Sequence, residues 1–88
     1  MIDIDNIIAK AEKCIENGNP FTVKTKYITL VLEPTDDETL LVEIDSIKKK
    51  VESNKDFIDY LDDLNDAEIE ITDLEEIMLD IETYEQDL

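Results

Sequence analysis

The sequence predicts a small α+β protein with an N-terminal helix, an antiparallel sheet of two or three strands, and two or three acidic helices towards the C-terminus. Three observations lead to this class. Apolar residues recur at helical spacing near both ends of the chain, they alternate at strand spacing in the middle, and turn residues separate these stretches. With 88 residues and a hydrophobic content of 42%, residues 1–88 are expected to fold as a single domain with a modest core.

The first helix is expected over residues 3–17. Apolar side chains recur there every three or four residues, at Ile4, Ile7, Ile8, Ala11 and Ile15. Asp3 or Asp5 can cap its start, because a carboxylate there accepts a hydrogen bond from a free backbone N–H. Gly18 follows at the position where a helix end favours a left-handed residue.

The middle of the chain predicts strands. Between Phe21 and Leu32 the apolar residues occupy odd positions at first and even positions later, so the inward phase changes near Thr25 and Lys26. This segment must therefore form either two short strands or one bent strand. Residues 27–45 are expected to form an antiparallel hairpin with an acidic turn at 33–38, because alternation resumes after that turn at Leu40, Val42 and Ile44.

A second helix is expected from a cap at Asp45 or Ser46 to the pair Asn65 and Asp66, with an interruption near Ser53 and Asn54. Its inward residues would be Ile47, Val51, Ile58, Leu61 and Leu64. Residues 67–72 are compatible with an extended link, an edge strand or a helical turn. The stretch from Thr72 to Glu75 has the spacing of a capping box. The last helix then shows an apolar stripe of Leu74, Ile77, Met78, Ile81 and Tyr84.

The composition argues against an enzyme. The chain has no histidine and no arginine, and its lone cysteine, Cys14, lies near an apolar stripe where a small core residue is expected. Asp62 to Asp66 are rich in oxygen ligands but lack the alternation and the central glycine of a calcium loop, so we expect neither metal nor cofactor. No apolar run approaches the roughly 20 residues that cross a bilayer, and the chain starts with acidic residues, which favours a cytoplasmic protein.

Negative charge is concentrated in the last third of the chain. Residues 1–55 carry 11 acids and 8 lysines, net −3, whereas residues 56–88 carry 14 acids and no base, net −14, which together give the formal net charge of −17. Such a chain is repelled by nucleic acid and by anionic membranes, and it associates readily with cationic proteins. A merely soluble surface is better served by mixed signs, so the pattern indicates that a partner supplies the positive charge.

Two rows of carboxylates have the spacing to imitate the phosphates of DNA, since helical residues three or four apart lie about 5 to 6 Å from one another. The rows are Asp59, Asp62, Asp63 and Asp66, and Asp73, Glu76 and Asp80. We therefore expect a DNA-like surface that enters the basic groove of a nucleic-acid-binding protein. Two other readings stay open: an ordinary solvated acidic face, and an interaction module, such as an antitoxin or assembly adaptor, that docks through the stripe of the last helix.

The order of elements resembles that of the small acidic anti-CRISPR proteins encoded by phages. The resemblance rests on the opening Met1-Ile2-Asp3-Ile4-Asp5-Asn6-Ile7-Ile8, on a sheet that begins Phe21-Thr22-Val23-Lys24, on the acidic hairpin turn and on the acidic C-terminal helices. It covers nearly the whole chain through layout and composition, without a diagnostic motif. It implies a non-catalytic inhibitor whose partner is the DNA-binding groove of a CRISPR effector nuclease in an infected bacterial host.

In that family the acidic face occupies the groove for the duplex that carries the PAM, and the hairpin can reach towards the nuclease active site. By the resemblance, the DNA-like face here would comprise Asp62, Asp63, Asp66, Glu68 and Glu70. The hairpin would contribute Asp36, Asp37 and Glu38. Paired arginines that read a PAM are the kind of group these carboxylates would suit.

Overall fold

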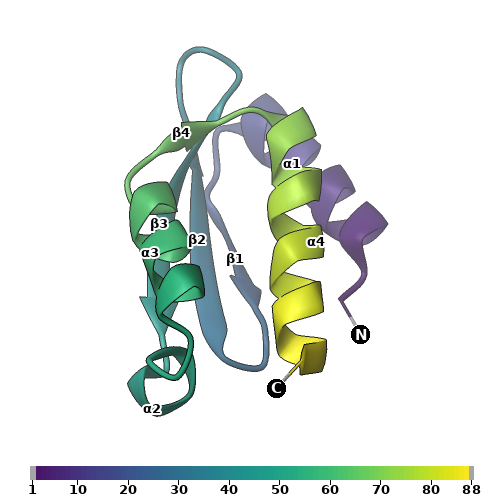
Figure 1. The fold of residues 1–88 in the computed structure, drawn as a ribbon. Helices are drawn as coiled ribbons and strands as arrows, with labels where there is room; N and C mark the ends of the chain where they lie inside the picture. Colours follow the sequence, from purple (N-terminus) through teal and green to yellow (C-terminus); the bar gives the residue numbers. More distant parts are fainter. Residues whose placement is uncertain (1, 88) are drawn as a thin grey trace.

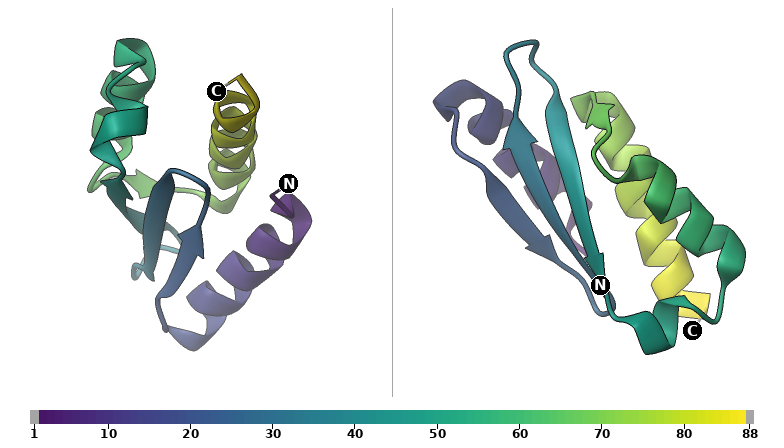
Figure 2. Two further views of the ribbon diagram at one scale, coloured as in Figure 1. Left: turned by 90° about the horizontal axis from the view of Figure 1, so that it is seen from below. Right: turned by 90° about the vertical axis from the view of Figure 1, so that its left-hand side faces the viewer.

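Four strands form one antiparallel sheet in the order β1-β2-β3-β4. The two long C-terminal helices lie over one of its faces, and the N-terminal helix lies beside the edge strand β1 (Figures 1 and 2). The computed structural model describes residues 2–87. Its elements are α1 (Ile4–Asn17), β1 (Phe21–Lys24), β2 (Ile28–Pro34), β3 (Leu40–Ser46), α2 (Lys48–Val51), α3 (Lys55–Leu64), β4 (Glu68–Ile69) and α4 (Ile71–Asp87). The predicted α+β class is confirmed, and the sheet has more strands than the two or three expected.

The additional strands come from the two places where the sequence left alternatives. The phase change near Thr25 is a tight turn, which makes β1 and β2 separate antiparallel strands with Phe21 opposite Leu32. Thr25 fixes this turn because its N–H donates to the carbonyl of Ile28 at 2.8 Å, while its Oγ1 accepts from the N–H of Ile28 at 3.1 Å. Residues 68–69 form the short edge strand β4, which pairs with β3.

The ends of α1 follow the sequence prediction. The Asp3 carboxylate accepts from the N–H of Asn6 at 3.1 Å, and Gly18 adopts the left-handed conformation with φ 73°. The predicted cap at Asp45 or Ser46 is wrong, because β3 continues to Ser46 and α2 begins after Ile47 without a side-chain cap.

The predicted interruption is confirmed, and it separates α2 from α3. Asn54 caps α3 by accepting from the N–H of Phe57 at 3.3 Å. The predicted capping box at Thr72 is wrong, because α4 starts at Ile71 and Thr72 already lies inside the helix. The carbonyl of Glu70 accepts the first helical hydrogen bonds, from the N–H groups of Asp73 and Leu74 at 3.1 Å.

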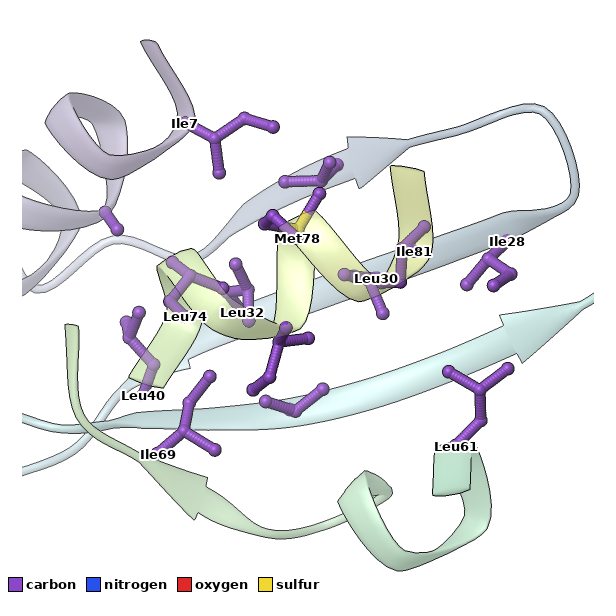
Figure 3. Close-up of a cluster of buried hydrophobic side chains, with 14 of the residues drawn as sticks. Ile7, Ile28, Leu30, Leu32, Leu40, Leu61, Ile69, Leu74, Met78 and Ile81 are labelled. Carbon is purple, nitrogen blue, oxygen red and sulfur yellow. The ribbon is translucent and has the colours of Figure 1, made fainter. Parts of the chain in front are cut away.

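The core lies between the helices and one face of the sheet (Figure 3). Alternate strand residues such as Leu30, Leu32 and Leu40 are buried against the stripe of α4. That stripe consists of Leu74, Ile77, Met78, Ile81 and Tyr84, and each of these residues is buried in the molecule itself. The opposite face of the sheet, which we call the open face, has no helix over it (Figure 2). Among residues 2–87, no helix is long and apolar enough to cross a membrane.

Candidate functional site

Two acidic helices, α3 and α4, are joined by aromatic side chains. The rings of Phe57 in α3 and Tyr84 in α4 stack with centroids 3.8 Å apart and planes 13° apart. The Tyr60 ring lies 6.0 Å from that of Phe57. The Tyr84 hydroxyl also donates to the carbonyl of Lys50 at 3.1 Å. We call Phe57, Tyr60 and Tyr84 the aromatic clamp, and it sets the position of α3 relative to α4.

Tyr60 brings carboxylates of α4 next to α3. Burial, which has the largest effect, the hydrogen bond to Asp80 and the negative charges of Asp80 and Glu76 together raise the pKa of the Tyr60 hydroxyl to about 12. A tyrosinate would be repelled by both carboxylates, so the neutral hydroxyl is the form that fits here. Asp80 and Glu76 therefore lie on the side of α4 that faces α3.

A row of carboxylates on each helix flanks this contact. Asp73, Glu76 and Asp80 follow at spacings of three and four residues and so share one side of α4. On α3, Asp56 and Asp63 flank Tyr60 at the same spacings. All five carboxylate residues are exposed. We call Asp56, Asp63, Asp73, Glu76 and Asp80 the interhelix acidic face.

The predicted positions on and after α3 are only partly brought to this face. Asp63 belongs to it, and Asp59, four residues earlier, extends it along α3. Asp62 instead lines a small hollow with Ile44 and Asn65, beside β3. Asp66 lies beyond the end of α3 with φ 61°, and its N–H donates to the carbonyl of Val42 at 2.6 Å.

Glu68 lies on another face of the molecule. Its neighbour in β4, Ile69, is buried towards the helices, and successive strand residues point to opposite faces, so Glu68 points to the open face of the sheet. The five positions that the resemblance implied for one DNA-like face, Asp62, Asp63, Asp66, Glu68 and Glu70, are therefore divided among different parts of the surface. The row of α4, predicted from spacing, stays together.

A second acidic cluster is formed by the turn between β2 and β3. Asp36, Asp37 and Glu38 are exposed there, and Asp37 and Glu38 line an open hollow of about 380 Å³ together with Glu70 at the start of α4. We call Asp36, Asp37, Glu38 and Glu70 the acidic tip.

Hydrogen bonds within the turn fix the shape of the acidic tip. The hydroxyls of Thr35 and Thr39 are 2.6 Å apart, and the Thr35 N–H donates to the Thr39 carbonyl at 3.0 Å. The N–H of Asp37 donates to Thr35 Oγ1 at 3.3 Å. Glu38 is held at φ 61°, a conformation that glycine adopts more readily than glutamate. The turn therefore keeps a carboxylate at a position where glycine would be the easier choice.

Lysines gather at the other end of the sheet from the acidic tip. The β1–β2 turn and α2 lie together there (Figure 1). The ammonium groups of Lys26 and Lys50 lie 5.2 and 5.9 Å from the centre of the Tyr27 ring. Since residues 56–88 hold no base, no lysine is contributed by the sequence that forms most of α3 and all of α4.

The sequence prediction missed two parts of the site. Asp56 was not among the predicted site residues, although its spacing from Tyr60 and Asp63 places all three on one side of a helix. The contact of Tyr60 with Asp80 joins different helices, and no local pattern reveals it. Cys14 is buried, as predicted, with its sulfur 3.8 Å from the Leu32 carbonyl, and burial raises its pKa.

Within the part of the chain that the structure describes, no three carboxylate or thiol side chains are grouped closely enough to hold a metal ion. Comparisons of the chain with protein-family models, with curated proteins and with solved structures find no match.

Proposed function

We propose that this protein is a non-catalytic inhibitor that presents the interhelix acidic face to the DNA-binding groove of another protein, and that its target is a CRISPR nuclease. The observation that carries the proposal is the placement of five exposed carboxylates along the junction of α3 and α4, in a stretch of chain without a base. A groove built for DNA offers lysine and arginine to phosphates, and these bases would pair equally well with such carboxylates.

The rigidity of the interhelix acidic face favours a DNA-mimicking decoy over an ordinary solvated acidic surface. The aromatic clamp and the burial of the α4 stripe hold the two helices in one arrangement. Carboxylates three or four residues apart then stay about 5 to 6 Å from one another. A partner would meet charges that are already in place, so less ordering entropy is lost on binding than with a flexible acidic tail.

The acidic tip gives the inhibitor a second point of contact. Glu38 keeps a left-handed backbone conformation that costs free energy for a residue with a side chain, and such strain persists where the surrounding structure holds it in place. We propose that the tip reaches into the same partner, beside the groove that the interhelix acidic face occupies.

The alternative function, docking of a partner through the apolar stripe of α4, requires that stripe to be exposed, and it is buried. Leu74, Met78 and Ile81 are each 0% exposed, because they pack against the chain's own sheet. A partner helix would have to displace that core. We therefore keep the acidic inhibitor as the proposed function.

Binding to a CRISPR effector, measured over rising salt, tests the proposal. The protein is expected to bind the effector at about 0.1 M salt, to compete with a duplex that carries the PAM, and to lose most of its affinity by about 0.5 M, because salt screens exposed charges. Binding that ignores salt, or that leaves duplex binding untouched, would overturn the decoy mechanism. Binding to a different DNA-binding protein alone would keep the decoy and refute the CRISPR target.

A matched pair of variants separates the face from total charge. The variant Asp63→Asn, Glu76→Gln, Asp80→Asn removes three charges from the interhelix acidic face. The control Glu12→Gln, Glu16→Gln, Glu43→Gln removes three charges from exposed positions of α1 and of the open face. The first variant is expected to weaken inhibition at least about tenfold and the control much less, since each lost charge-assisted contact is worth about 1 kcal/mol or more. Equal losses would mean that only net charge matters.

A further inference from the structure

The edge of the sheet at β1 offers unpaired backbone groups. The strand order is β1-β2-β3-β4, so β1 has a neighbour on one side only. The N–H of Thr25 donates to Ile28 in β2, and in an antiparallel pair the residues that face the neighbouring strand alternate. Val23 therefore bonds to β2, whereas the N–H and C=O groups of Thr22 and Lys24 point away from the sheet.

A groove runs along this edge, between β1 and α1. The six consecutive residues from Phe21 to Lys26 line it, together with a row on α1 that includes Asn6, Ile7 and Lys10, and its volume is about 480 Å³. Successive side chains of a strand point to opposite faces of the sheet, so a hollow over one face would touch only every second residue. This hollow touches every residue of β1 and therefore follows the edge of the strand. Ile7, Phe21 and Val23 give the groove an apolar lining.

Lysines outnumber carboxylates along the groove, which is lined by three lysines and by Asp3 and Glu85, whereas acids outnumber lysines in the whole chain. Lys10, Lys24 and Lys26 all line it, although the whole chain has only eight lysines. A carboxylate already occupies one outward position, since the N–H of Lys26 donates to Oε1 of Glu85 at 2.7 Å. Lys26 follows Thr22 and Lys24 in the outward series. The folded protein thus already has one hydrogen bond from a backbone N–H at this edge to a carboxylate oxygen.

We propose that this groove binds an extended peptide segment of a partner protein, added to β1 as a further strand, in which apolar residues alternate with carboxylates. The backbone groups of Thr22 and Lys24 complement another peptide backbone, a recognition mode in which main-chain bonds give affinity and side-chain pockets give specificity. Nucleic acid and a second copy of the chain each carry much more negative charge than a short segment with two or three carboxylates, so the net charge of −17 repels them more strongly than it repels such a segment. This site is separate from the interhelix acidic face and stands whether or not the proposed function does.

A labelled hexapeptide of alternating valine and glutamate is the probe, and fluorescence anisotropy reports its binding to the full chain. Amide exchange measured by NMR then locates the contact. Exchange at Thr22 and Lys24 is expected to slow at least about tenfold on binding, because these amides gain partners, while Val23, already bonded to β2, changes little. Binding that leaves Thr22 and Lys24 unprotected would overturn the proposal.

Two control probes test the backbone and the charge separately. The same hexapeptide with N-methyl groups on alternate residues keeps its side chains but cannot bond to the edge, and it is expected to bind at least about tenfold more weakly, since it loses two or three hydrogen bonds. A valine–lysine hexapeptide, which the acidic faces attract, is expected to leave the amide exchange of Thr22 and Lys24 unchanged. Equal affinity for the methylated probe would refute strand addition.

Variants of the protein complete the test. Lys10→Ala with Lys24→Ala is expected to weaken the valine–glutamate probe, whereas Lys48→Ala with Lys55→Ala, which removes two lysines outside the groove, is expected to leave it unchanged. Glu85→Gln is expected to tighten binding, because it removes a negative charge and keeps an oxygen for Lys26. Thr22→Pro deletes an outward N–H and should abolish protection at Lys24.

Sedimentation tests whether a second copy of the chain occupies the edge instead. A dimer that dissociates when Thr22→Pro is introduced would assign the edge to a second copy and overturn the peptide proposal.

Discussion

Two helices that contact each other, α1 and α4, differ sharply in charge. Both bury a stripe in the common core, α1 through Ile7, Ala11 and Cys14 and α4 through Leu74, Ile77, Met78, Ile81 and Tyr84. The exposed surface of α1 carries both acids and lysines, whereas α4 carries acids alone. Because α1 shows that mixed charge is compatible with this packing, the charge of α4 is not a requirement of the fold. It lowers stability through repulsion and calls for a functional explanation.

The largest expected effect comes from removing what holds α4 in place. Leu74→Ala is expected to lower the free energy of unfolding by about 2 to 5 kcal/mol, because Leu74 is 0% exposed and its loss leaves a cavity. Urea denaturation measures the change. On α1, Ala11→Gly removes only a methyl group and is expected to cost about 1 kcal/mol, mainly through helix propensity. A similar loss for both would mean that the two helices contribute equally to the core.

Neutralising the interhelix acidic face is expected to stabilise the protein while it weakens inhibition. Asp63→Asn, Glu76→Gln, Asp80→Asn removes several like-charge contacts at helical spacing, each worth about 0.2 to 0.5 kcal/mol, so a gain of about 1 kcal/mol is expected. Raising the salt concentration should stabilise the wild type more than this variant. Thermal unfolding at two salt concentrations measures both effects, and an unchanged or lower melting temperature would contradict the repulsion that separates α4 from α1.

Two left-handed residues extend the comparison to the backbone. Gly18 ends α1 at φ 73°, with nothing within 4 Å of the site of a Cβ, and Glu38 adopts φ 61° in the acidic tip. Gly18→Ala is expected to cost about 1 kcal/mol, and Glu38→Gly to gain up to about 1 kcal/mol, offset in part by the greater freedom of glycine in the unfolded chain. Urea denaturation of both variants measures whether each substitution raises or lowers the free energy of unfolding. A destabilised Glu38→Gly would show that the carboxylate itself stabilises the turn.

The last effect concerns Tyr60 and is absent at neutral pH, because it appears only at high pH. Its pKa is raised from about 10 to about 12 in the folded protein, so the stability it contributes is complete below pH 10 and is lost as the pH rises towards 12. The free energy of unfolding of the wild type should therefore fall more steeply over this range than that of Tyr60→Phe. Absorbance at 295 nm should also lose one tyrosinate step, near pH 12, in the variant. Parallel stability curves would contradict the raised pKa of Tyr60, and with it the burial of Tyr60 beside Asp80.

The sequence predicted this fold well where the spacing of apolar residues determines which side of a strand or helix is buried. The alternation at Leu40 and Val42 and the helical stripe of α4 both led to buried faces, and Asn54 lies at the expected helix break. Caps were predicted less well. The expected box begins at Thr72, whereas the carbonyl of Glu70, two residues earlier, accepts the first hydrogen bonds of α4, directly after β4 pairs with β3.

The candidate site was harder to predict than the fold. The spacing of Asp73, Glu76 and Asp80 identified a face of α4, but the assignment of Glu68 to the same face required knowledge of which side of β4 is buried. The contact between Tyr60 and Asp80 joins residues that only the tertiary packing brings together. The edge groove likewise depends on the strand order, which leaves β1 without a second neighbour.

The segregation of the lysines has a practical consequence for isolating a target. The lysines belong to α1, to β1 and the turn after it, to α2 and to the first residue of α3. Amine chemistry that couples the protein to a resin will therefore attach it through these elements and leave α4 itself unmodified. A column made in this way keeps the carboxylates of its anionic helices intact for passing proteins, whereas coupling through carboxyl groups would consume them.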